Sequence, residues 1–98
     1  KDQINIAETY IEQNEFKKAL SSIDMIAATD IDSWLNDERT KSLPIEERAA
    51  QMEMFGKSVY LAAFCSSKLN DKETQTKMVE KYKQYFPKGK FISDIAKL

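Results

Sequence analysis

The chain has 98 residues, of which 42% are hydrophobic and 32% charged, and its net charge at pH 7 is −1. These values fit one globular domain and exclude a disordered or membrane-spanning chain. The longest apolar run, residues 59–65, is far shorter than the roughly 20 residues that cross a bilayer. We therefore expect no direct membrane insertion of this segment.

The residues that usually carry catalysis and metal binding are scarce. Histidine is absent and Cys65 is the single cysteine, so an internal disulfide is excluded and a zinc site lacks its usual ligands. The sequence has neither a glycine-rich phosphate loop nor a G-x-S-x-G motif. Glu46 and Glu47 are adjacent, so on a helix they point about 100° apart and form no carboxylate dyad. We predict a protein that is not an enzyme and has no cofactor and no metal.

A helical hairpin is predicted at the start of the chain. Apolar residues at helical spacing indicate helices over about 3–13 and 16–28. Asn14 and Glu15 form the short turn between them, which makes the two helices antiparallel neighbours. Because the chain begins with Lys1 rather than Met, we interpret it as an excised or processed segment.

Residues 29–43 are the least regular part of the sequence. Asp30 can cap a short helix in which Ile31, Trp34 and Leu35 share one face. We expect a short helix or an ordered loop here. Trp34 is then either a lid over the open end of a hairpin, which we favour, or an exposed anchor for a partner.

A long central helix is predicted from Pro44 to about Leu69. Proline suits the first position of a helix. Gly56 weakens the helix by about 1 kcal/mol relative to alanine. Residues 59–65 are apolar on every side, which indicates packing all round. The first half has one apolar stripe, made of Ile45, Ala49, Met52 and Phe55.

The remaining chain predicts one further long helix and a short last one. Asn70 can cap a helix over 72–86, with Glu73 completing a capping-box-like pair. Gly89 permits a turn before a short helix over 91–98. The prediction is a single all-α domain, 1–98, of about five helices, organised as hairpin 3–28, insert 29–43, hairpin 44–86 and C-terminal helix 91–98.

Residues 7–20 resemble a tetratricopeptide repeat (TPR). In that family a small residue and a tyrosine precede a polar turn, and an aromatic and a crossing alanine follow it. Small residues at the crossing let the two helices approach closely. A weaker copy spans about 59–87, where Gln75 replaces the crossing alanine, and the two turns lie 56 residues apart rather than 34. The residues that fill the first pattern are Ala7, Tyr10, Phe16 and Ala19.

The resemblance implies a right-handed α-α superhelix in which the first helix of each hairpin lines a concave groove for a protein or peptide. Tyr60 and Phe64 could instead be core residues, which we favour because 59–65 is apolar all round. Glu8 would repel a C-terminal carboxylate ligand. The groove-facing candidates carried over are Asn5, Glu8 and Glu12 from the first hairpin, and Lys57, Tyr60, Phe64 and Lys68 from the second.

Residues 85–96 are similar to a junction found in TPR lipoproteins of the bacterial envelope, where an aromatic-proline pair is followed by a small residue, an aromatic and an alanine. This similarity implies the periplasmic side of a bacterial envelope as the location. A cytoplasmic location stays open.

Charge is divided unevenly along the chain. Residues 1–56 hold 12 acidic and 6 basic groups, whereas residues 57–98 hold 4 acidic and 9 basic groups. Two solvated surfaces are the favoured interpretation, and stacking on neighbouring repeats or an anionic partner are the alternatives. The lysines are not interleaved with aromatic residues as in single-strand binders, so we expect no nucleic acid. We predict a protein-interaction or scaffold module, or alternatively a self-associating structural bundle or spacer.

Overall fold

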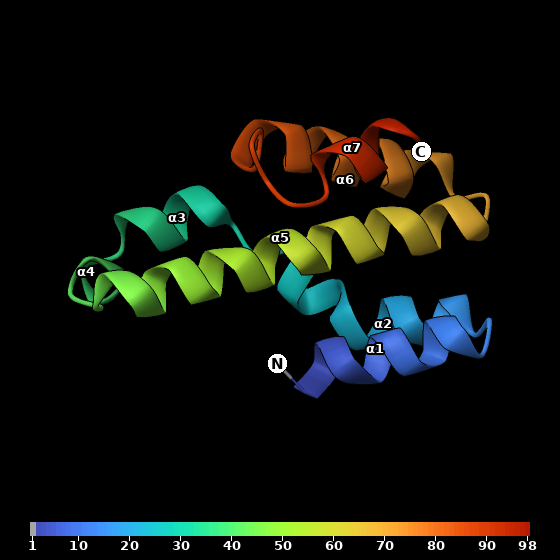
Figure 1. Cartoon of the computed structure of the whole chain (residues 1–98), viewed down its shortest axis with the longest axis horizontal. Coiled ribbons are helices and arrows are strands. Elements are labelled where there is room, and N and C mark those ends of the chain that lie inside the picture. Colours follow the sequence, from blue (N-terminus) through green and yellow to red (C-terminus); the bar gives the residue numbers. More distant parts are fainter. Residues whose placement is uncertain (1) are drawn as a thin grey trace.

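The computed structural model describes residues 2–98, and within that range it holds seven helices and no strand (Figure 1). The all-α class is therefore confirmed. The expected number of about five helices is too low, because the insert forms two short helices of its own. The helices are α1 (Asp2–Glu12), α2 (Phe16–Ala27), α3 (Ile31–Asn36), α4 (Glu38–Lys41), α5 (Ile45–Lys68), α6 (Lys72–Tyr85) and α7 (Ile92–Ala96).

Helix α5 is the centre of the molecule. It packs against α2 on one side and against α6 on the other, while α1 pairs with α2 and α7 folds onto α6 (Figure 1). The contacts are close because the side chains at the crossings are small. Ala7, Ala19, Ala62 and Ala63 are all fully buried, and Ile23 fills the space beside them.

The two hairpins use the same turn. Asn14 and Asn70 both have a left-handed backbone, with φ of 61° and 60°. In the first turn the Glu15 N–H donates to the Tyr10 carbonyl at 2.8 Å, and the Asn14 N–H donates to the Ile11 carbonyl at 3.0 Å. The second turn repeats both bonds, at 2.9 and 3.2 Å. This is a Schellman motif, in which asparagine is one of the few residues that tolerate the left-handed position.

The predicted capping role of Asn70 is wrong by one residue. Because Asn70 ends α5 in the left-handed conformation, Asp71 becomes the cap of α6 and its carboxylate accepts the Thr74 N–H at 3.1 Å. The cap predicted for the insert is confirmed, since the Asp30 carboxylate accepts the Ser33 N–H at 3.1 Å.

The first half of α5 is less covered than its sequence indicates. Pro44 is the N-cap rather than the first helical residue, so α5 begins at Ile45. Phe55 is buried against Trp34, with ring centroids 5.0 Å apart, but Ile45 is 75% exposed. Helices α1 and α2 lie along the C-terminal half of α5, while α3 and α4 lie beside its first turns (Figure 1). Burial of the predicted stripe therefore holds at Phe55, holds in part at Met52 and fails at Ile45 and Ala49.

Both glycines serve close approach between segments. A Cβ on Gly56 would lie 3.2 Å from the ring of Phe86, at the point where the end of α6 meets α5. Gly89 lies against the Tyr82 hydroxyl, and neither glycine has a positive φ. That hydroxyl accepts the Phe91 N–H at 2.9 Å. Gly89 thus makes room for the bond that holds Phe91, rather than supplying a special backbone conformation.

Helix α6 also fastens the end of α2 and the insert. Lys81 Nζ donates to the carbonyl of Ala27 at 2.6 Å and to the carbonyl of Thr29 at 2.7 Å. Ala27 is the last residue of α2 and Thr29 follows two residues later, so the lysine binds carbonyl groups at the C-terminal end of this helix. Burial lowers the pKa of Lys81. One turn further on, the Tyr85 hydroxyl donates to the Asp32 carboxylate at 2.5 Å, and this bond raises the pKa of Tyr85.

We predict that Asn70→Ala lowers the free energy of unfolding by about 1 kcal/mol, because a Cβ-bearing residue without a short polar side chain is strained at φ 60°. Urea denaturation followed by circular dichroism at 222 nm measures the change. Asn70→Gly is the matched control and should be neutral or slightly stabilising. Equal losses in both variants would contradict the role assigned to the turn.

We predict that Lys81→Met lowers the free energy of unfolding by about 1–3 kcal/mol, because two carbonyls lose a charged donor. Lys83→Met on the exposed side of α6 is the control and should stay within about 0.5 kcal/mol of the parent. Chemical denaturation of both variants under one condition makes the comparison. A loss in the control as large as in Lys81→Met would show that the effect is not specific to the α2 end.

Candidate functional site

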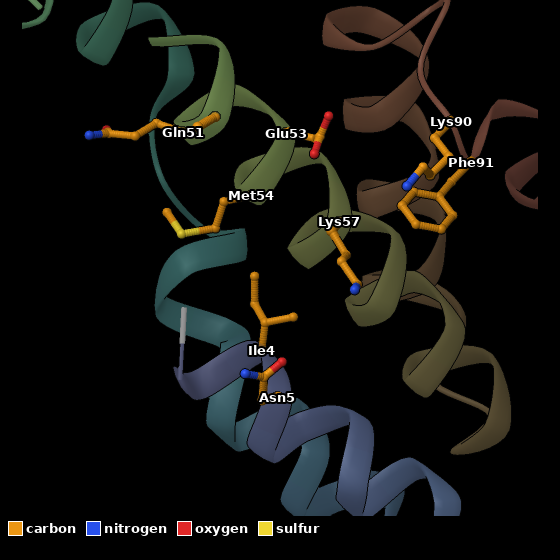
Figure 2. Close-up of a pocket in the computed structure, with 9 residues that line it drawn as sticks. Ile4, Asn5, Gln51, Glu53, Met54, Lys57, Lys90 and Phe91 are labelled. Atoms are coloured by element: carbon orange, nitrogen blue, oxygen red, sulfur yellow. The ribbon is translucent and has the colours of Figure 1, made fainter. Parts of the chain in front are cut away.

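A groove of about 470 Å³ lies over the exposed face of α5 (Figure 2). One flank is formed by the first turn of α1 and the other by the segment that leads into α7. Met54 lies on the side of α5 that faces Ile4, and Gln51 extends toward the connection between α2 and α3, whereas Glu53 lies on the side of Lys90 and Phe91 (Figure 2). The lining residues are Ile4 and Asn5 from α1, Ala50, Gln51, Glu53, Met54 and Lys57 from α5, and Lys90 and Phe91.

The groove exists because α5 is about twice as long as α1 and α2, which cover one side of it. Positions 50, 53, 54 and 57 recur at helical spacing, so they share one face of α5. Helix α1 is 11 residues long against 24 for α5, and its first turn lies at this part of α5 (Figure 2). The face is therefore bordered by α1 at Ile4 and left open beyond it.

The groove has an apolar wall on each flank, Met54 between them and a polar rim. Ile4, Met54 and Phe91 are buried or half-buried and supply the apolar contact surface. Lys57 forms an ion pair with Glu8 at 2.9 Å, and this pair joins α1 to α5 at one end of the groove. This combination suits the binding of a side chain or a segment of another chain.

Phe91 is held rigidly as the wall of the groove. Its ring stacks on Tyr60, with the centroids 4.5 Å apart and the planes 1° apart. Burial raises the pKa of Tyr60, so its hydroxyl stays protonated at neutral pH. Together with the bond from the Phe91 N–H to Tyr82, the stack fixes the ring in place. Tyr60 therefore lies behind the wall and supports it.

The structure brings part of the predicted site together. Asn5 and Lys57 line the groove, and Glu8 is the ion-pair partner of Lys57. Tyr60 acts through Phe91. Glu12 is exposed near the other end of α1, beyond the residues that line the groove.

The other predicted residues lie elsewhere. Phe64 is half-buried in an edge-to-face contact with Phe16, with centroids 6.0 Å apart. Lys68 lies over the Phe64 ring at 5.4 Å. Trp34 packs on Phe55 near the first half of α5, as a cover for that helix.

Several groove residues escaped the sequence analysis. Ile4 and Met54 are apolar, so the sequence alone predicts them as core residues. They line a groove instead because α1 begins beside them and covers α5 no further. Ala50 had the clearest signal for an open helix face in the sequence. It lies three residues before Glu53 and seven before Lys57, so the three share one face of α5, and this face has few large apolar residues. Phe91 was assigned to the last helix, but it precedes α7.

A wider and flatter depression lies over α1 and α2. Most of the residue types that line it are polar, and Lys18 lies over the Tyr10 ring at 5.9 Å. Since it offers less apolar surface than the α5 groove, it is the weaker binding site. Its lining residues are Gln3, Tyr10, Glu15, Lys17, Lys18, Ser21 and Ser22.

Other chemistry is sparse in the part of the chain that the structure describes. Residues 2–98 contain no group of three or more acidic, cysteine or histidine side chains placed to hold a metal ion. Within the same residues no helix is both long and apolar enough to span a bilayer. Cys65 is fully buried in the core, and burial raises the pKa of its thiol to about 11. The thiol is therefore neither ionised nor accessible at neutral pH.

No protein-family model matches this chain, and comparisons with curated proteins and with solved structures also gave no match.

We predict that Cys65 reacts with a thiol reagent at neutral pH at least about 100-fold more slowly in the folded protein than in 6 M urea, because the thiolate is scarce and shielded. The raised pKa means that the thiolate forms in the folded state only as the pH approaches about 11. Absorbance of the released thiol dye follows the reaction. Fast reaction in the folded state would contradict the burial of this residue.

Proposed function

We propose that the chain is a non-enzymatic protein-interaction module, built from TPR-like helical hairpins, that binds a segment of another protein chain in the α5 groove. The observation that carries the proposal is the groove itself. It has an apolar wall on each flank, Met54 between them and a polar rim, and its volume of about 470 Å³ is within the common range for binding sites.

The shape of the groove favours a helical segment as the occupant. A helix laid along α5 would contact Ile4 on one flank and Phe91 on the other. Apolar residues at three- and four-residue spacing would supply the contact area, as in other helix-in-groove complexes. Lys57 and Lys90 would orient carboxylates of the partner at the rim.

The arrangement of the hairpins supports the TPR-like part of the proposal. Small residues lie fully buried where α1 meets α2, and first helices of both hairpins, α1 and α5, contribute to the groove. The two hairpins also end their first helices with the same Schellman turn. The chain departs from the family pattern in the length of α5 and in the insert that holds α3 and α4.

The chemistry of the lining supports binding rather than catalysis. Its ionisable side chains are Glu53, Lys57 and Lys90, and Lys57 is already paired with Glu8. These groups do not form the nucleophile and base pair that covalent catalysis uses. The proposal therefore assigns the groove no reaction.

We predict that Ala50→Arg weakens binding in the groove without unfolding the domain, because Ala50 is exposed and arginine is a good helix former. Peptides selected from an unbiased 16-residue display library against the parent protein are the probe. Their affinity, measured by fluorescence polarisation, should fall about tenfold or more in Ala50→Arg, a change of about 1.4 kcal/mol.

Thr76→Arg is the matched control, because Thr76 is exposed on α6 away from the groove. It should leave the affinity unchanged. Circular dichroism confirms that both variants are folded. Selected peptides that bind the parent and Ala50→Arg equally well would refute the groove as the binding site.

A further inference from the structure

We infer that the occupant of the groove is a second copy of this chain, placed so that the two α5 helices pack antiparallel about a two-fold axis near Gln51 and Met52. In this arrangement Glu46 of each copy meets Lys57 of the other. The inference rests on the proposed function, since it names the partner for the same groove.

The first observation is the order of charges along the exposed face of α5. Glu46, Ala50, Glu53 and Lys57 follow one another at spacings of four, three and four residues, so they share one face. Glu46, Ala50 and Glu53 are exposed, and Lys57 lines the groove. The face carries a carboxylate at its start, Ala50 and the Glu53 carboxylate in its middle, and an ammonium group at its end, over about 16 Å of helix.

Such an order is complementary to itself. A symmetric dimer uses one patch twice, so the patch must contain both members of every contact. When a second α5 is laid antiparallel with position 46 opposite position 57, position 50 falls opposite position 53. The small Ala50 then faces the larger Glu53 and Met54 of the partner copy, which allows the helices to approach closely.

The two-fold axis also places the flanks correctly. The two-fold axis lies between the two α5 helices and is perpendicular to the plane that contains both. Rotation about this axis keeps the same flank of each α5 on the same side of the dimer. The two Glu53 carboxylates therefore come to the flank that carries Lys90, where the two lysines of the dimer offset their repulsion (Figure 2).

Lys57 has room for a second carboxylate. Its ion pair with Glu8 leaves the two side chains 37% and 40% exposed, so the ammonium group still faces solvent. An ammonium group has three donors and can serve both Glu8 of its own copy and Glu46 of the other. These exposed pairs set the register of the dimer.

The test exchanges the charges at the two positions. Sedimentation equilibrium of the parent chain should show a monomer–dimer equilibrium, and Glu46→Lys and Lys57→Glu should each raise the dissociation constant about tenfold or more, because like charges then meet twice. An equimolar mixture of the two variants should form a heterodimer as tight as the parent dimer, since both contacts are again of opposite sign. Native mass spectrometry distinguishes this heterodimer by mass.

A second measurement stays available if a charge variant folds poorly. Ala50→Cys treated with a short bismaleimide should form a covalent dimer, whereas Thr76→Cys should not, because position 50 lies near the axis. The buried Cys65 does not compete for the reagent. A parent chain that remains monomeric up to millimolar concentration, or charge variants whose mixture fails to associate, would overturn the inference.

These results separate the inference from the proposed function. A monomeric parent that still selects peptides blocked by Ala50→Arg would remove the second copy as partner and keep the groove. A parent chain that neither selects peptides nor forms dimers would refute both the groove as a binding site and the second copy as its occupant.

Discussion

Close packing of one long helix against two others determines the rest of this structure. Helix α5 contacts α2 on one side and α6 on the other, which is possible because small side chains lie at the crossings. Ala19, Ala62 and Ala63 have no exposed surface, and Gly56 admits the ring of Phe86. A larger side chain at any of these positions would separate the helices and lose the dispersion contacts that a dense core supplies.

The same packing leaves one face of α5 open. The first hairpin covers the C-terminal half of α5, and α3 and α4 lie beside its first turns (Figure 1). Between them the face at Ala50 remains open. Its walls are fixed by contacts that are distant in the sequence, such as the stack of Tyr60 on Phe91 and the ion pair of Glu8 with Lys57. Because these contacts hold the walls in place, the groove itself would lose less conformational entropy on binding a partner.

The insert is held by polar contacts as well as by the burial of Ile31 and the contact of Trp34 with Phe55. Lys81 and Tyr85 on α6 reach the end of α2 and the start of α3, where they bind two carbonyls and the Asp32 carboxylate. Because these contacts fix where the chain enters α3, they also position Trp34 over Phe55.

The tetratricopeptide-like interpretation of the hairpins stays a proposal, since it rests on residues 7–20 and on the repeated turn.

The local features of the fold follow from the sequence by itself. Apolar spacing located α1, α2, α5, α6 and α7 to within two residues at each end, whereas the two helices of the insert were expected only as one short helix or a loop. The role of Asp30 as a cap follows from its short side chain. The sequence could not decide which apolar residues would be covered, because periodicity marks a face of a helix but not the length of its neighbour. Ile45 is exposed and Ile4 borders a groove for that reason. Of the predicted partner-binding residues, Asn5 and Lys57 line the groove, whereas Phe64 and Trp34 pack against other aromatic rings. Tertiary structure alone decided the site, because Phe91 reaches the groove through a bond to Tyr82 and a stack on Tyr60 that no local pattern encodes.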